Sequence, residues 1–228
     1  MVLADSISTD SQGYDLIVQQ LVPGYASLAR LAVALLAVSP LASLQGSQVL
    51  VAGCGTGAEL LEARAQRPDW HLTAIDPSAA MLEIARHRLG LDANTVQWQQ
   101  TTVEAMEADA RFDGALSVLV LQSLSDDGSK LAFLTALARS LRPGGQLVLV
   151  DLMAPERSSL QQQVDAAWLG FQQASGITAG AVVAGLTQGV HPIGGSRLAA
   201  LVEAAGFSDP APIFQALNVQ GFLLQKLP

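Results

Sequence analysis

The sequence predicts an α/β fold in which a mostly parallel β-sheet is covered by helices on both faces. Three observations support this fold class. Short apolar runs alternate with helical segments between residues 49 and 152, a pattern typical of parallel strands joined by crossover helices. The first apolar run ends in a glycine-rich turn that leads directly into a helix. Half of the 228 residues are hydrophobic and 14% are charged, which is enough apolar surface for one large domain.

The N-terminal segment, residues 1–46, is predicted to form a helical cap. Residues 15–38 have helical character, interrupted by the helix-breaking pair Pro23-Gly24. After this break, apolar side chains recur at helical spacing and form one face: Leu28, Leu31, Leu35 and Val38.

Residues 47–152 are predicted to form the core of the domain. Short apolar runs between turn-forming residues indicate strands, which we expect at residues 49–52, 72–75, 96–99, 115–120 and 147–152. Intervening helices are expected at residues 58–66, 78–89 and 130–141, the last of them closed by Arg142-Pro-Gly-Gly145.

The rest of the chain has a less regular pattern. Residues 153–200 are expected to form an insert that begins as a helix and then becomes rich in Gly and Ala. Residues 201–228 are expected to complete the domain, with no linker that would mark a second one. The elements expected here are a helix over 197–205 stopped by Gly206 and two closing strands, 213–216 and 221–225, joined around Asn218.

Composition disfavours several classes of function. The net charge is −8 and Lys and Arg form no run, so the chain lacks the electrostatic attraction on which nucleic-acid binding depends. The only cysteine, Cys54, cannot form an intrachain disulfide, and the three histidines (His71, His87 and His191) lack the spacing of metal ligands. We therefore expect no metal, and nucleic acid is disfavoured as a partner.

The sequence also carries no obvious targeting signal. No basic stretch followed by an apolar one opens the chain, so a secretory signal is not expected. The longest apolar run, residues 31–38, is stopped by Pro40 and is too short to span a bilayer. These features predict a cytoplasmic protein without a membrane partner. The apolar cap and insert are compatible with a homodimer.

Three alternating glycines, Gly53, Gly55 and Gly57, follow the first apolar run and precede a helix. Glycines allow a tight turn and a close approach of the backbone to a ligand, and the N–H groups that open a helix attract an electron-rich group. The alternative is an ordinary tight connection between strand and helix. Cys54 within this turn could be a nucleophile, but a small packing side chain is the simpler interpretation.

Asp76 ends the second strand about twenty residues later, where a carboxylate can accept both hydroxyls of a ribose. The alternative is helix capping, because Pro77 and Ser78 begin a helix. A glycine loop followed by such an acid is typical of adenosine cofactors in general. Gly53-x-Gly55-x-x-Ala58 also fits the dinucleotide fingerprint, so a nicotinamide-dependent dehydrogenase is one alternative.

Three motifs together resemble those of class I S-adenosylmethionine-dependent methyltransferases: Val49-Leu-x-x-Gly-Cys-Gly-Thr-Gly57, Ile75-Asp-Pro-Ser-x-x-Met-Leu-x-x-Ala85 and Leu141-Arg-Pro-Gly-Gly-x-Leu-Val-Leu149. The resemblance covers roughly residues 49–152. It implies a Rossmann-like, seven-stranded mixed sheet with an antiparallel last strand, S-adenosylmethionine as cofactor and S-adenosylhomocysteine as product. It also implies that Pro77 and Met81 flank the adenine, and that Thr102 and Val103 lie at its edge.

Four shorter segments are similar to the carboxy-S-adenosylmethionine synthase group, which serves wobble-uridine modification of tRNA: Leu21-Val-Pro-Gly-Tyr25, Leu121-Gln-Ser-Leu124, Ala205-Gly-Phe207 and Phe214-Gln-x-x-Asn218. This similarity implies that Tyr25 reaches the cofactor from the cap, and it aligns Val118 with an Asn that the group has after the fourth strand. For Tyr25 the alternative is ordinary packing after a turn.

The sequence also departs from these families. Val51 stands where class I enzymes usually have the acid that holds the cofactor's ammonium, and Thr102 stands where they have an Asp at the adenine. No Lys or Arg lies between Arg157 and Arg197 to hold an extra carboxylate, which is costly to bury unpaired. Carboxy-S-adenosylmethionine synthesis is therefore disfavoured. Cofactor affinity should be lower than the family norm by roughly 1.5–3 kcal/mol, about tenfold to hundredfold, and a non-catalytic binding protein is a further alternative.

The sequence thus predicts in-line transfer of a methyl group to a small, apolar or aromatic acceptor, with the insert as a lid. Such a reaction needs positioning and exclusion of water more than a catalytic dyad. Acceptor-site candidates come from the cap, the strand ends and the insert: Tyr14, Tyr25, Gln122, Asp151, Trp168, Phe171 and His191. His191 is the candidate proton acceptor because its reference pKa is near neutral, and a loop histidine before Pro192 is the alternative. For Trp168 and Phe171 the alternative is core packing.

Overall fold

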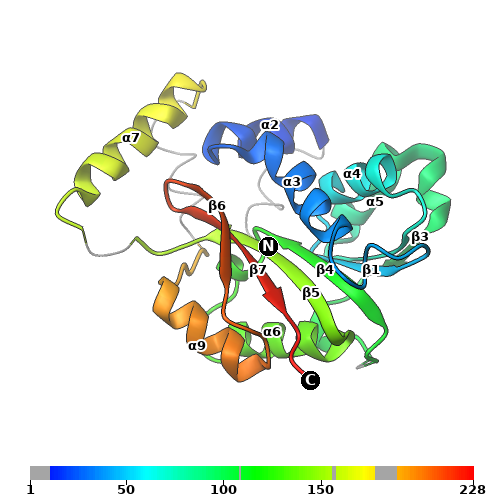
Figure 1. Cartoon of the computed structure of the whole chain (residues 1–228). Coiled ribbons are helices and arrows are strands. Elements are labelled where there is room, and N and C mark those ends of the chain that lie inside the picture. The colour runs from blue at the N-terminus through cyan, green and yellow to red at the C-terminus, as the bar shows by residue number, and fades with distance from the viewer. Residues whose placement is uncertain (1–10, 108, 156–157, 178–188) are drawn as a thin grey trace.

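The fold is a seven-stranded β-sheet between two layers of helices (Figure 1), seen in a computed structural model that describes residues 11–107, 109–155, 158–177 and 189–228. The strand order is β3-β2-β1-β4-β5-β7-β6, with β1 to β5 parallel and β7 antiparallel to both of its neighbours. This confirms the predicted mixed sheet with an antiparallel last strand. The strands are β1 Gln48–Ala52, β2 His71–Ile75, β3 Val96–Gln99, β4 Phe112–Val118, β5 Leu141–Leu152, β6 Ala211–Ala216 and β7 Val219–Gln225.

Helices α3, α4 and α5 cover one face of the sheet, and α6 and α9 cover the other, whereas α2 and α7 stand away from it (Figure 1). The α-helices are α2 Ser11–Leu21, α3 Tyr25–Ala37, α4 Ala58–Gln66, α5 Ala79–Leu89, α6 Ser129–Ser140, α7 Gln161–Ala174 and α9 Gly195–Ala205. Short 3-10 helices are η1 Gly90–Thr95, η2 Val103–Ala105 and η3 Leu121–Ser123.

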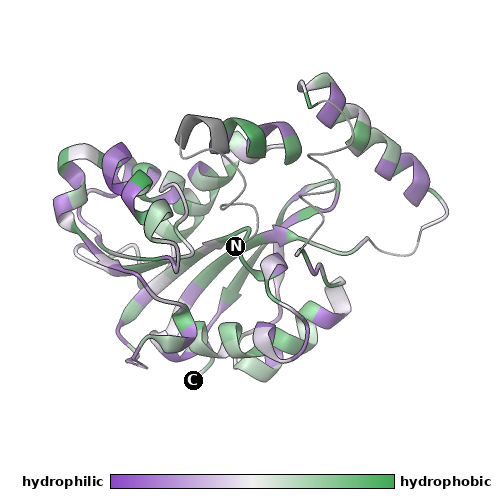
Figure 2. Cartoon of the chain, turned by 180° about the vertical axis from the view of Figure 1, so that it is seen from behind, coloured by the Kyte–Doolittle hydropathy of each residue, from purple (hydrophilic) through white to green (hydrophobic). Residues whose placement is uncertain are grey.

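The central strands are apolar because both of their faces are covered. In β1, Val49 to Ala52 are all at most 1% exposed, and Leu50 lies between Thr73 of β2 and Ala115 of β4. Figure 2 shows hydrophobic stretches along these strands, while the covering helices alternate between hydrophobic and hydrophilic turns. Continuous burial explains why these strands read as unbroken apolar runs.

The prediction of β4 and β5 was wrong in its boundaries. Strand β4 ends at Val118 rather than at residue 120, because Leu119 has a φ of 58° and turns the chain out of the sheet. Strand β5 begins at Leu141, which pairs with Phe112, so Arg142-Pro-Gly-Gly145 belongs to a strand and does not only close a helix. The register shifts between this pair and the next, and a shift of this kind accommodates a proline within a strand.

The predicted break in the N-terminal helical segment is confirmed. Gly24 has a φ of 81°, and the helical axes on either side of it, α2 and α3, differ by 95°. The predicted stop at Gly206 is also confirmed, since this residue caps α9 with a φ of 89°. Among the described residues, no single helix has the length and apolar character to cross a membrane, although α2 and α3 would qualify as a bent pair.

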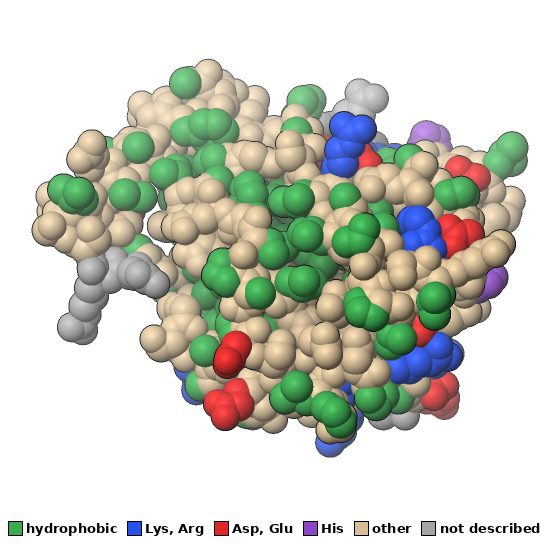
Figure 3. Space-filling model, viewed as in Figure 1, with side chains coloured by type: hydrophobic (Ala, Val, Ile, Leu, Met, Phe, Trp, Pro, Cys, Tyr) green, Lys and Arg blue, Asp and Glu red, His purple; other side chains and the backbone are tan. Residues whose placement is uncertain are grey.

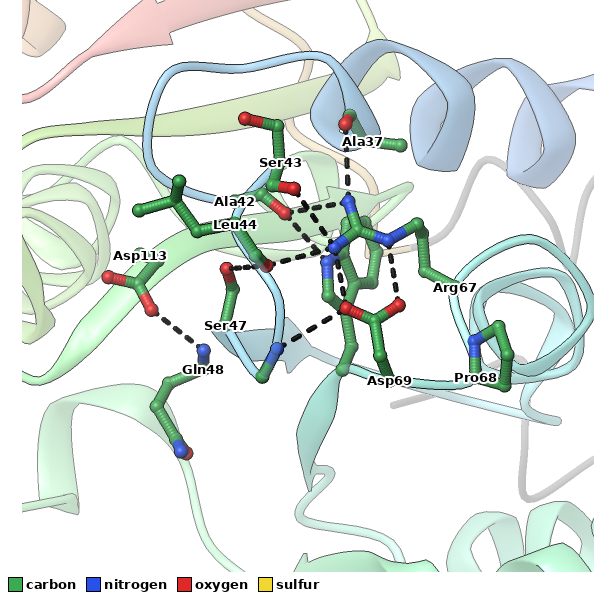
Figure 4. Close-up of polar contacts among 12 residues, drawn as sticks. Ala37, Ala42, Ser43, Leu44, Ser47, Gln48, Arg67, Pro68, Asp69 and Asp113 are labelled. Atoms are coloured by element: carbon green, nitrogen blue, oxygen red, sulfur yellow. Dashed lines mark hydrogen bonds and ion pairs between the residues drawn. The ribbon is translucent and has the colours of Figure 1, made fainter.

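The connector between α3 and β1 is held by Arg67, which follows α4 (Figure 4). The Arg67 guanidinium pairs with Asp69 at 2.7 and 2.9 Å, and Trp70 donates its indole N–H to the Ala42 carbonyl at 2.7 Å. Arg67 also donates to four carbonyl oxygens of the connector and of the end of α3: Ala37, Ala42, Ser43 and Leu44. This arrangement, here called the Arg67 clamp, fixes the chain just before β1 begins.

Candidate functional site

The loop Gly53–Gly57 joins the carboxyl end of β1 to α4, and all three of its glycines have positive φ. A Cβ on Gly53 would lie 2.4 Å from Val120 Cγ2, and one on Gly57 would lie 3.0 Å from Ala85 Cβ. A Cβ on Gly55 would meet nothing within 4 Å. Two glycines therefore allow close packing within the protein, whereas Gly55 faces open space that a ligand can enter.

Asp76, directly after β2, faces this loop. One carboxylate oxygen accepts the Gly55 N–H at 2.9 Å and the other accepts the Ser78 N–H at 2.9 Å. The cap of α5 is Ser78, whose hydroxyl accepts the Met81 N–H, so Asp76 supports the cap rather than forming it. Burial raises the pKa of Asp76, while its two backbone hydrogen bonds lower it. Each oxygen keeps capacity to accept one further hydroxyl.

The other predicted cofactor residues lie at the carboxyl ends of neighbouring strands. Pro77 is exposed and Met81 is buried after β2, and Thr102 is exposed and Val103 is buried after β3. Val118 is half-buried at the end of β4. Strand order reverses between β1 and β4, and in such sheets ligands bind in the crevice outside the carboxyl ends at this point.

Two residues of this region have no polar role. Cys54 is 2% exposed, and burial raises the pKa of its thiol far above the ordinary value, so it stays protonated and fits the packing interpretation. Val51 is 1% exposed within the core, which leaves β1 without a carboxylate.

Besides Asp76, two further carboxylates near the loop come from α4 and α2. Glu59, in the first turn of α4, is 8% exposed, and burial raises its pKa to about 7, with Asp15 adding to the shift. Asp15 of α2 accepts the Thr56 hydroxyl at 2.7 Å and pairs with Arg88 at 2.7 Å. Arg88 also donates to the Thr56 carbonyl. No sequence pattern predicted this group, because its members are brought together only by the fold.

A second buried polar group lies at the ends of β4 and β5. Asp151 is 1% exposed, and its carboxylate accepts N–H groups from Leu121 at 2.7 Å, Gln122 at 3.0 Å and Leu152 at 2.9 Å. Lys130 is fully buried and donates to the Leu121 carbonyl at 2.5 Å. Burial raises the pKa of Asp151 to about 7. Because its oxygens are bound to the backbone, Asp151 does not face an acceptor, contrary to the prediction.

The remaining acceptor candidates are spread over three places. His191 is exposed, and its backbone N–H donates to the Gln122 carbonyl at 2.6 Å, so these two residues meet beyond β4. Trp168 of α7 donates its indole N–H to the Leu21 carbonyl at 2.7 Å, which ties the insert to α2.

Phe171 is half-buried on the same helix as Trp168. Tyr25, the first residue of α3, is half-buried and packs against the core on the α3 side of the sheet. The side chain of Tyr14 lies outside the described residues.

Figure 3 shows hydrophobic side chains gathered in a hollow of the surface between the positions of α3 and β6. Both elements contribute apolar side chains that are only partly buried, among them Tyr25, Ile213 and Phe214. Among the described residues, no group of three or more His, Cys, Asp or Glu side chains could hold a metal ion.

Comparison with known proteins points to one family. Residues 49–145 match the model of a family described as "Methyltransferase domain". An O-methyltransferase of Aspergillus nomiae is 35% identical over 115 residues, which are 49% of this chain and 49% of that protein. A demethylmenaquinone methyltransferase of Tropheryma whipplei is 37% identical over 112 residues, which are 49% of this chain and 44% of that protein. The matched region is thus about half of each protein's length or less.

A solved structure shares the fold over nearly the whole chain. The 1,6-didemethyltoxoflavin-N1-methyltransferase of Burkholderia thailandensis, solved with 1,6-didemethyltoxoflavin and S-adenosylhomocysteine, has a TM-score of 0.64 and 20% sequence identity. The alignment covers 99% of this chain and 87% of that one.

Proposed function

We propose that the chain is a class I S-adenosylmethionine-dependent methyltransferase acting on a small molecule, from the premise that its residues 49–145 match a methyltransferase family model. One observation carries the proposal. Within that segment, the open side of Gly55 and the carboxylate of Asp76 lie together where the strand order reverses. This is the place where an α/β sheet of this topology binds an adenosine cofactor.

The residues present fit such a cofactor. Asp76 is held in place by two backbone N–H groups and can accept one ribose hydroxyl on each oxygen. Gly55 lets the cofactor approach the backbone, and the family resemblance assigns Pro77, Met81, Thr102 and Val103 to the surroundings of the adenine. When bound, the cofactor supplies an electrophilic methyl group on a sulfonium. The chain's part is to orient the acceptor and to exclude water.

The acceptor is proposed to be apolar or aromatic, with the insert as its lid. Helix α7 carries Trp168 and Phe171; Leu160, which precedes the helix, and Leu169 on it are 63% and 44% exposed. An exposed apolar surface of this kind suits an apolar ligand better than a charged one. His191 is proposed to take up the acceptor's proton, since its backbone is anchored beside the end of β4 by Gln122 and its imidazole is exposed.

The carboxy-S-adenosylmethionine synthase group is the second candidate, favoured by the similarity at Leu21–Tyr25 and at residues 121–124. The absence of Lys and Arg from residues 158–196 argues against it, because an added carboxylate would have no cation to pair with. The buried Val51 favours a third candidate, a protein that binds the cofactor without turnover.

The first experiment is thermal unfolding of the chain with S-adenosylmethionine, S-adenosylhomocysteine or NAD. A ligand at a hundred times its Kd raises the free energy of unfolding by about 2.7 kcal/mol. We expect a rise in Tm with both sulfur cofactors, none with NAD, and none with any of them in Asp76→Ala. No rise with either sulfur cofactor would refute the proposal.

Turnover is then measured as transfer of a labelled methyl group to a panel of phenols, quinols and heteroaromatic amines. Product with an aromatic acceptor supports the methyltransferase. Cofactor binding without any product would favour the non-catalytic candidate, and tighter binding of carboxy-S-adenosylmethionine than of S-adenosylmethionine would favour the second.

A further inference from the structure

We propose that Asp151 is a positioning residue for cofactor binding, a step that rests on the proposed function. Its buried carboxylate holds the turn after β4, residues 119–123, here called the exit turn. The exit turn packs on Gly53 and so holds residues 53–57, here called the cofactor loop, in their binding conformation. Asp151 would thus act on the cofactor without touching it.

The first part of the argument is the polar contact around Leu121. Its N–H is bound by Asp151 at 2.7 Å and its carbonyl by Lys130 at 2.5 Å. The next N–H, that of Gln122, is bound by the other Asp151 oxygen at 3.0 Å. Both charged side chains are at most 1% exposed. Charge-assisted hydrogen bonds in a buried place are short and directional. They therefore fix both the carbonyl and the N–H of the peptide unit between Leu121 and Gln122.

The second part is the conformation that these bonds maintain. Leu119 has a φ of 58°, which a side chain with a Cβ rarely adopts. Its N–H is bound to the Val150 carbonyl at 2.7 Å, next to Asp151 in β5. Strand β5 thus holds the exit turn on both sides of Val120 and helps to keep it in an unfavourable conformation.

The third part is the contact with the cofactor loop. Val120 is so close to Gly53 that a Cβ added there would lie 2.4 Å from its Cγ2. Valine has a single rotatable side-chain bond and is stiff, so a shift of the exit turn would move Val120 relative to Gly53. The loop would then lose this support and keep its anchor on the Ile75 carbonyl, which accepts the Gly53 N–H at 2.8 Å.

The exit turn also holds the segment that carries His191. The Gln122 carbonyl accepts the His191 N–H at 2.6 Å, and the Ile193 carbonyl accepts the Ala154 N–H at 2.9 Å. Asp151 is thus placed to align the cofactor loop and this segment at the same time. A role as a proton acceptor is excluded by its own geometry, because the carboxylate is 1% exposed and engaged by three N–H groups.

The test is Asp151→Asn with Asp113→Asn as a matched control. Asn keeps the shape but turns one acceptor into a donor opposite a backbone N–H. Asp113 is also buried, accepts the Gln48 N–H at 2.8 Å and pairs with Arg142 at 2.6 Å, but it lies at the amino ends of β1, β4 and β5. Each variant is measured for thermal stability, for the Kd of S-adenosylhomocysteine, and for amide hydrogen exchange of residues 53–57 without ligand.

We expect both variants to lose stability, but only Asp151→Asn to bind S-adenosylhomocysteine about tenfold more weakly, because binding must then supply about 1.4 kcal/mol to restore the conformation of residues 53–57. Only in Asp151→Asn should amide exchange of residues 53–57 become faster. If methyl transfer is observed, KM for the cofactor should rise while kcat at saturation is retained. An equal Kd and equal exchange in Asp151→Asn, or the same losses in Asp113→Asn, would overturn the proposal.

Val120→Ala provides a second test if Asp151→Asn does not fold. It leaves the charged groups intact and removes the methyl groups that pack on Gly53 and on the neighbouring core. We expect faster exchange of residues 53–57 and weaker binding of S-adenosylhomocysteine, whereas wild-type values for both would overturn the proposal. A wild-type chain that binds no cofactor would refute the proposed function. The exchange measurement needs no ligand, so it would still test whether Asp151 holds residues 53–57 in place.

Discussion

Alanine substitutions at Gly53 and Gly55 should separate folding from cofactor binding. Both positions have positive φ, 69° and 49°, so each alanine costs about 1–2 kcal/mol of stability through its backbone conformation. At Gly53 the new Cβ also lies 2.4 Å from Val120 Cγ2, and overpacking adds about 1–3 kcal/mol. The expected loss is therefore roughly 2–5 kcal/mol for Gly53→Ala and about 1–2 kcal/mol for Gly55→Ala.

The affinity for the cofactor should fall more in Gly55→Ala than in Gly53→Ala, which is the reverse of the order expected for stability. The Cβ of Gly55→Ala projects into open space, which is the space assigned to the cofactor, so a steric cost of about 1–3 kcal/mol falls on binding, about tenfold to hundredfold in Kd. Unfolding in urea gives the stabilities, and calorimetric titration of S-adenosylhomocysteine gives the affinities. Combining Gly53→Ala with Val120→Ala should recover part of the lost stability, because the two sites are in contact.

Two results would refute this reasoning. If Gly55→Ala binds S-adenosylhomocysteine as tightly as the wild type, the open side of Gly55 is not where the cofactor lies. If Gly53→Ala is as stable as Gly55→Ala, then Val120 moves freely and the packing described for the exit turn is wrong.

Three further predictions concern charges. Burial raises the pKa of Glu59 from 4.5 to about 7. The contribution of its protonated form to the free energy of unfolding is therefore complete below pH 4.5 and is lost as pH rises toward 7. Between pH 5 and 8, Glu59→Gln should become more stable than wild type by up to about 3 kcal/mol in urea unfolding, and a difference that does not change with pH would contradict this. Arg67→Lys should lose about 2–3 kcal/mol, since lysine cannot reproduce the forked contacts, whereas the exposed Arg197→Lys should lose under about 1 kcal/mol; equal losses would count against the Arg67 clamp. Asp15→Asn should accelerate amide exchange in α2 relative to wild type, because it weakens the pairing with Arg88, and unchanged exchange would show that other contacts hold α2.

The layers of the fold could be predicted because their signals are local. Apolar runs such as 49–52 mark strands buried on both faces, and Gly24 before α3 and Gly206 after α9 interrupt helices through their own backbone conformation. The boundaries of β4 and β5 could not be predicted, because they depend on the left-handed turn at Leu119 and on pairing across the sheet at Leu141. Apolar leucine gives no sequence signal for such a turn.

The candidate site divides in the same way. Gly53, Gly55, Gly57 and Asp76 belong to a compact pattern, and the structure places them together. The contacts of Asp15 with Thr56 and of Asp151 with Leu121 join residues that are distant in sequence, so only tertiary structure brings them together. The homodimer, the acceptor lid and the role of His191 stay predictions, since they depend on surfaces and ligands beyond the chain's own packing.

The position of β7 has a consequence for synthesis of the chain on the ribosome. Strand β7 lies between β5 and β6 and pairs with β5 from Gln146↔Gln225 to Leu152↔Val219. At ~5–20 residues per second, the roughly 70 residues between these strands take on the order of 4–14 s to translate. During this interval the nascent chain exposes an unpaired and apolar edge at Leu147 to Val150, the kind of edge that pairs with other chains. Chaperone protection is therefore needed most between the emergence of β5 and that of β7.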